Sequence, residues 1–229
     1  GEIEPSERLK IIKFAAEASG RESLEIRMCA LRLAKYMVEI DSSSPVIKFI
    51  LQIVKNNKNN NNISATYLKY RILNRIGGYE KEVSECESAL SRYSVGISNV
   101  FLENLKVDTP WVVKAVNIEL LLDNLNNGRP GELLHITTHL SNLLKVSEKI
   151  TVRHSAGRAL LKVIGMLPLD ERNEVVIELM RGLEIGEYQF SKYIPAYLGE
   201  MSLYLHPNEL DEFMKELIKQ AESTNDQIS

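Results

Sequence analysis

The chain has 229 residues, 44% of them hydrophobic, and a formal net charge of −3 at pH 7. This apolar content is enough to build a folded core, and the net charge argues against a general nucleic-acid-binding protein. No run of 18 apolar residues is present, so no membrane-spanning segment is expected. The only cysteines, Cys29 and Cys86, are too few for a disulfide framework, and we expect a reducing, cytoplasmic location.

Helical periodicity covers nearly the whole chain, whereas alternating β-branched runs are scarce. We expect helices at residues 5–19, 23–39, 45–57, 64–76, 79–93, 97–106, 110–125, 130–146, 149–166, 168–183, 188–205 and 208–222. Pro45, Pro110, Pro130 and Pro168 lie where the first turn of a helix tolerates proline. Because the connecting loops are short, neighbouring helices should form antiparallel hairpins.

One helical pattern recurs along the chain. Its clearest copy is ITVRHSAGRALLKVI, in which the apolar anchor Val152 is followed by Arg153 and then by Ala156 and Ala159 on one helical face. The matching anchors, at spacings of 39, 48, 39 and 38 residues, are Ile26, Ala65, Val113, Val152 and Phe190. A period near 40 residues with two helices per period is typical of stacked helical hairpins.

The run from Val152 to Leu160 resembles the second helix of a HEAT repeat, and Ile26–Ala34 matches the same pattern. The resemblance implies an all-α fold of the HEAT or armadillo-like type, an α-α superhelix, with residues 1–229 as a single helical-repeat domain. It also implies that the basic residues after the anchors pair with acidic or polar groups near neighbouring hairpin turns. These residues are Arg27, Lys114 and Arg153. The 48-residue spacing predicts an irregular unit at 79–106.

Charge is unevenly distributed. Residues 1–76 carry 13 Lys and Arg against 8 Asp and Glu, and no acidic residue lies between Asp41 and Glu80. Within that acid-free segment, tyrosines alternate with basic residues. The candidate partner-binding residues are Tyr67, Tyr70, Arg71, Arg75, Arg158 and Lys162. The tyrosine-rich helix is either a solvated face, a surface for an acidic protein, or a site for nucleic acid held by stacking and charge.

The face of each second helix that lies opposite its anchors is unusually apolar, as Met28, Leu31, Ala115 and Ile118 show. Either neighbouring helices enclose these positions, or they form an apolar groove for a peptide or helix. Charged and tyrosine side chains run beside them as a rim, which is common at interfaces. The rim consists of Arg32, Tyr36, Arg71, Arg75, Glu119, Asp123, Arg158 and Lys162.

No residue pattern indicates catalysis or a cofactor. His135 and His139 are four residues apart, as helical metal ligands can be, but a glutamate after the first histidine and a third ligand are missing. His154 and Ser155 are adjacent on a helix, so their side chains diverge and do not form a nucleophile–base pair. We therefore predict no catalytic, metal-binding or cofactor-binding residue.

These patterns favour a non-catalytic interaction scaffold or regulatory module that binds another protein or another domain of its own chain. Ile228 lies 38 residues after Phe190, so we expect a sixth anchor there and a native protein that continues past Ser229, as a fragment of a larger protein would. One alternative is a HEAT-like nucleic-acid-binding protein, such as a DNA-repair glycosylase for alkylated bases. Another is a HEAT-like lyase acting on a chromophore, for which no residue set is evident.

Overall fold

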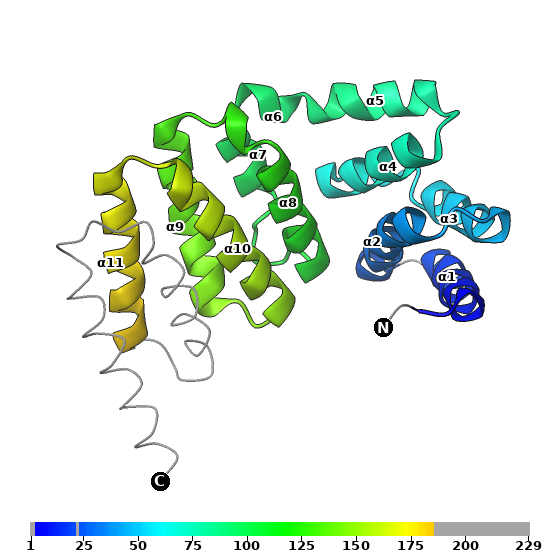
Figure 1. Ribbon diagram of the computed structural model, residues 1–229, viewed down its shortest axis with the longest axis horizontal. Coiled ribbons are helices and arrows are strands. Elements are labelled where there is room, and N and C mark those ends of the chain that lie inside the picture. The colour runs from blue at the N-terminus through cyan, green and yellow to red at the C-terminus, as the bar shows by residue number, and fades with distance from the viewer. Residues whose placement is uncertain (1–2, 22, 186–229) are drawn as a thin grey trace, which may run out of the picture. The chain divides into compact units, whose positions relative to one another are not determined.

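The computed structural model describes residues 3–21 and 23–185, and all regular secondary structure in these ranges is helical (Figure 1). This confirms the all-α prediction for the described residues. The chain divides into two compact units, Gly1–Asn127 and Gly128–Ser229, which are described separately below. The predicted repeat shows no break at this boundary. The helices expected at 188–205 and 208–222, and the anchor Phe190, lie outside the described residues.

The first unit begins with two helical hairpins. Their helices are α1 (Pro5–Ser19), α2 (Leu24–Ile40), α3 (Ser44–Asn56) and α4 (Ile63–Ile76). Helix α1 packs on α2 and α3, and α2 packs on α3 and α4, so the two hairpins lie against each other (Figure 1). Helix α8 (Trp111–Asp123) packs on both α2 and α4. The second helices of the two hairpins and α8 therefore meet in one group of three.

The irregular segment of the first unit holds three short helices. They are α5 (Glu80–Leu90), α6 (Arg92–Val95) and α7 (Ile97–Glu103), and the 3₁₀ turn η1 (Leu125–Asn127) follows α8. The single helix predicted at 79–93 is wrong, because the helix breaks after Leu90. Next to this break the hydroxyls of Ser91 and Ser94 donate to the carbonyl oxygens of Ser88 and Ser91. Such side-chain bonds compete with the helical ladder.

A buried polar link explains why the repeat pattern is weakest at α8. Asn117 occupies a position where the pattern expects a small or apolar residue, and it is fully buried. Its amide oxygen accepts a hydrogen bond from the hydroxyl of Tyr93, and its amide nitrogen donates to the carbonyl of Phe101 at 2.8 Å. Because buried polar groups need partners, Asn117 joins α6 and α7 to α8.

The second unit consists, in its described part, of α9 (Pro130–Val146), α10 (Ile150–Met166) and α11 (Leu169–Ile185), which pack on one another. Arg153, only 2% exposed, donates from Nε to the carbonyl of Ser147 at 2.6 Å and from Nη2 to that of Lys145 at 2.8 Å. Arg172 makes the same kind of contact with the carbonyls of Leu167 and Gly165. Each arginine thus binds carbonyl groups at the end of the preceding helix, which have no partner inside that helix.

The remaining repeat positions differ in burial. The anchors Ala65, Val113 and Val152 are completely buried, as is Ala156, whereas Ile26 is 38% exposed. Arg27 and Lys114 are half-buried, and the Nε atom of Arg27 has no hydrogen-bond partner among the described residues. Ile26 differs because it lies on the side of α2 that faces a surface groove and not the neighbouring hairpin.

Candidate binding surface on α2, α4 and α8

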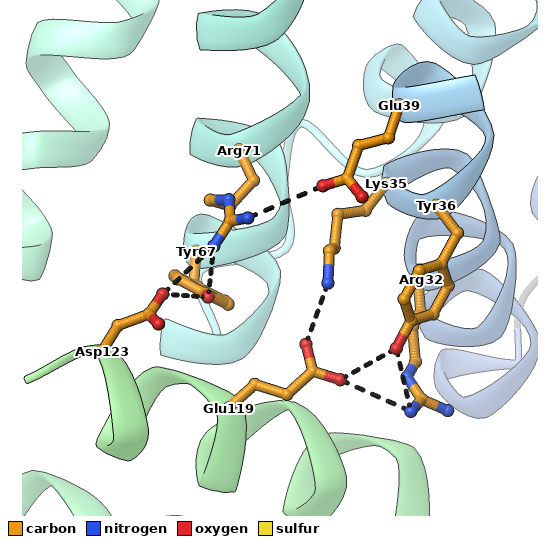
Figure 2. A network of polar contacts seen from close by, with 8 residues as sticks. All are labelled: Arg32, Lys35, Tyr36, Glu39, Tyr67, Arg71, Glu119 and Asp123. Atoms are coloured by element: carbon orange, nitrogen blue, oxygen red, sulfur yellow. Dashed lines mark hydrogen bonds and ion pairs between the residues drawn. The ribbon is translucent and has the colours of Figure 1, made fainter. Parts of the chain in front are cut away.

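Polar side chains from three helices meet where α2, α4 and α8 come together, and we call this set the three-helix face (Figure 2). Its members are Arg32, Lys35, Tyr36, Glu39, Tyr67, Arg71, Glu119 and Asp123. Five of them belong to the charged rim that the sequence predicts. Lys35 was placed among the inner positions instead, and Glu39 was not singled out. The structure therefore brings most of the rim in the first unit into one network.

Glu119 is the centre of the first half of this network. One carboxylate oxygen lies 3.4 Å from Nη2 of Arg32 and accepts a hydrogen bond from the hydroxyl of Tyr36 at 3.2 Å. The other oxygen lies 3.3 Å from Nζ of Lys35. The Lys35 ammonium also sits over the Tyr36 ring, 4.3 Å from its centroid, which is a cation–π distance. Two cations from α2 thus converge on one carboxylate of α8.

Asp123, one turn further along α8, is the centre of the second half. It accepts hydrogen bonds from the hydroxyl of Tyr67 and from Nη1 of Arg71, the latter at 3.1 Å. Nη1 of Arg71 also donates to the Tyr67 hydroxyl at 3.0 Å, and its Nη2 lies 3.6 Å from Oε1 of Glu39 on α2. Burial and the hydrogen bond to Asp123 raise the pKa of Tyr67 well above its usual value. Tyr67 therefore remains protonated and acts as a donor.

The chemistry of the face follows from these pairings. Arg32, Lys35 and Arg71 each lie within ion-pair distance of a carboxylate, so three cations are matched by three anions, Glu39, Glu119 and Asp123 (Figure 2). Such a face has a fixed arrangement of both charges and no excess of one sign. It can recognise a partner by complementary hydrogen bonds and aromatic contacts.

The predicted partner-binding residues fall in different places. Tyr67 is only 4% exposed, so it supports the network and offers little surface to a partner. Arg71 is half-buried within the network, and Tyr70 is half-buried on the same helix. Arg75 is exposed one turn beyond Arg71, and no ion pair involves it. Arg158 and Lys162 are both exposed on α10 in the second unit, outside this face.

The apolar inner positions resolve the two readings of that surface. Met28, Leu31, Ala115 and Ile118 have no exposed area, because neighbouring helices cover them. The groove that the sequence allowed at these positions is therefore absent. Lys69, which fits the repeat poorly, instead donates to the carbonyls of Asn57 and Asn60 in the asparagine-rich loop.

A separate apolar groove lies between α1 and α2, with a volume of about 420 Å³. It is lined by Phe14, Ala15, Ala18, Ser23, Glu25, Ile26, Cys29, Ala30 and Leu33. Phe14 is 69% exposed, which is unusual for a large aromatic side chain, and nothing in the sequence pattern distinguished it. We call this surface the α1–α2 groove.

The two histidines on α9 contact each other edge to face, with ring centroids 4.9 Å apart. Burial and the neighbouring His135 lower the pKa of His139 below its usual value. Within residues 3–21 and 23–185, no cluster of three or more histidine, cysteine or acidic side chains is placed to hold a metal ion. The helices of the same ranges include none with the length and apolar character needed to cross a bilayer.

Known proteins give no further assignment. Comparisons with protein-family models, with curated proteins and with solved structures find no match to this chain.

Proposed function

We propose that this protein is a non-catalytic protein-interaction module built from HEAT-like or armadillo-like helical hairpins stacked into a superhelix. The side-by-side packing of the α1–α2 and α3–α4 hairpins supports the repeat architecture. So does the full burial of the anchors Ala65, Val113 and Val152. Arrays of this kind bind partners on surfaces made by consecutive second helices.

The observation that carries the proposal is the preassembled three-helix face. Tyrosine and arginine are enriched at protein interfaces, where they supply contact area and hydrogen bonds at little additional cost of ordering. Here Arg32 and Tyr36 are held by Glu119, and Arg71 is held by Asp123. Since these side chains are already ordered, a partner loses less free energy in fixing them.

The same pairing disfavours nucleic acid as the ligand of this face. A phosphate backbone binds by displacing counterions from free basic groups, and the cations of the face already have carboxylate partners. The exposed basic residues without ion pairs in this region are Lys48, Lys55, Lys58 and Arg75, on helices or loops beside it. A mixed-charge protein surface matches the face better than a uniform anion does.

A crosslinking experiment with matched variants tests the proposal. The protein is crosslinked in its native cells, and its partners are identified for wild type, Arg75→Glu and Lys48→Glu. Arg75 is exposed on α4 next to the three-helix face, and Lys48 is exposed on α3, so both changes reverse one exposed charge in the same acid-free segment. We expect specific partners that Arg75→Glu loses and Lys48→Glu retains.

Two results would overturn the proposed function. One is a set of crosslinked proteins that is the same for both variants, since binding would then not involve this face. The other is tight binding of labelled duplex or single-stranded DNA that weakens steeply with salt and is lost in Arg75→Glu, which would support the nucleic-acid alternative.

A further inference from the structure

Helix α1 has two apolar sides. Ile12, Ala15 and Ala16 are buried against the rest of the first unit, whereas Ile11 is 36% and Phe14 is 69% exposed on another side. A surface helix of a monomer normally has one apolar stripe and an otherwise polar circumference. A second apolar stripe that is open to solvent indicates a contact surface.

The exposed side of α1 combines a protrusion with a matching hollow. Phe14 stands at the α1–α2 groove, and much of the groove is lined by the small side chains of Ala15, Ala18, Cys29 and Ala30. Small residues allow another helix to approach closely and leave room for a large side chain. A surface that has both the protruding ring and the hollow can bind a second copy of itself about a two-fold axis.

The charges beside Phe14 fit the same arrangement. Lys10 lies one turn before Phe14 and Glu17 about one turn after it, both are exposed, and neither takes part in an ion pair among the described residues. Because they are seven residues apart, they lie on the same flank of α1. In two antiparallel α1 helices that cross at Phe14, Lys10 of each copy lies opposite Glu17 of the partner subunit. A two-fold axis produces this favourable pair twice.

We propose that the α1–α2 groove is the docking surface for a second copy of this chain, in a dimer with antiparallel α1 helices. Phe14 of each copy enters the groove of the other, and Lys10 pairs with Glu17 of the partner subunit on both sides. This inference is independent of the three-helix face, because its groove is lined by residues of α1, of α2 and of the loop between them, and none of these belongs to that face.

The first test measures the mass of the full chain in solution by sedimentation equilibrium over about a hundredfold range of concentration. We expect a reversible monomer–dimer equilibrium for wild type, and for Phe14→Glu a dissociation constant raised by more than about tenfold, because a charge would enter an apolar groove. Val107→Glu is the matched control, since Val107 is 99% exposed in the loop before α8. A wild-type chain that stays monomeric throughout overturns the proposal.

A charge-exchange series identifies the geometry of the dimer. Lys10→Glu and Glu17→Lys should each weaken dimerisation several-fold, because each places like charges opposite one another twice. The double variant should regain dimerisation close to wild type. Since residues 10 and 17 are two turns apart within one chain, this rescue can arise only between copies. Circular dichroism checks that each variant is folded, and a double variant as weak as the single ones rejects the antiparallel arrangement.

The two free cysteines supply an internal control. Cys29 lines the α1–α2 groove, whereas Cys86 lies on α5, away from it. Burial raises the pKa of both thiols, so their reactivity toward a maleimide should respond to access in a similar way. The rate of Cys29 alkylation, measured by mass spectrometry relative to Cys86, should fall as the protein concentration rises. An unchanged ratio in a dimeric sample would place the dimer interface elsewhere.

Discussion

Tyr93 on α6 donates its hydroxyl hydrogen bond to the amide oxygen of Asn117 on α8, and neither side chain has any exposed area. The pair lies 24 residues apart in sequence and ties the irregular segment to the helix that contacts α2 and α4. Removing one partner leaves the other buried without a hydrogen bond, which costs more than the bond itself contributes.

Tyr93→Phe should therefore lower the free energy of unfolding by about 1–2 kcal/mol, and Asn117→Ala by about 2–4 kcal/mol, because the second change also leaves a cavity. The double variant Tyr93→Phe with Asn117→Ala should cost less than the sum of the two single changes, since no hydroxyl remains unsatisfied. Urea unfolding followed by circular dichroism measures all three. Strict additivity would show that the two side chains are not coupled.

Glu119 should contribute more to stability than an exposed carboxylate in a comparable ion pair. Its side chain is 21% exposed, and its loss leaves Arg32 and Lys35 facing each other without a counter-charge. We expect Glu119→Ala to lower the free energy of unfolding by about 2 kcal/mol, a value reduced from that of a fully buried pair because water reaches the site.

The matched control is Glu103→Ala, whose partner Arg92 and own side chain are both 57% exposed. This change should cost less than about 1 kcal/mol, and its effect should shrink in high salt. Equal effects in the two variants would mean that the three-helix network adds nothing beyond ordinary surface pairs.

Arg153 should behave as a structural residue and not as a surface charge. Its guanidinium binds two carbonyls at the turn between α9 and α10. Arg153→Lys keeps the charge but cannot reproduce both contacts, so we expect the unfolding free energy to fall by about 2–3 kcal/mol. Arg158→Lys, at an exposed position of the same helix, should change it by less than about 0.5 kcal/mol. Thermal unfolding of both variants compares them directly.

Stability should fall steeply at alkaline pH because of two tyrosines. Burial is the main cause that raises the pKa of both Tyr67 and Tyr93 above the usual value of 10.0. The unfolded chain ionises these phenols near pH 10, whereas the folded chain keeps them protonated. Their contribution is therefore complete below pH 10 and is lost as the pH rises above it.

Urea unfolding at pH 8, 9.5 and 11 measures this loss, and Tyr67→Phe and Tyr93→Phe should each make the pH dependence shallower. Ultraviolet absorbance of phenolate gives a second reading, since the nine tyrosines of the chain should not all titrate before unfolding. If every tyrosine ionises reversibly near pH 10 in the folded protein, the burial of these two hydroxyls is contradicted.

The sequence by itself determined the helices of the described residues. The predicted helix at 130–146 coincides with α9, and the one at 63–76 was misplaced by a single residue at its start. Helix ends depend on neighbouring residues, such as Pro130 in the first turn of α9 and Gly77 after α4, where the φ angle of 79° favours glycine. Local signals of this kind can be read without knowing the fold. The rim of Arg32, Arg71, Glu119 and Asp123 likewise followed from helical periodicity.

Only the tertiary structure decided which of these side chains meet. Glu119 binds Arg32 from 87 residues away in sequence, and the periodicity of each helix contains no information about its neighbour's rotation. The break after Leu90 also depends on distant contacts, because it lets Tyr93 reach Asn117. The exposure of Phe14 has the same origin, since an apolar stripe becomes core or surface according to what packs against it. Such outcomes arise from the sum of long-range contacts, and these overrule local preference where the two conflict.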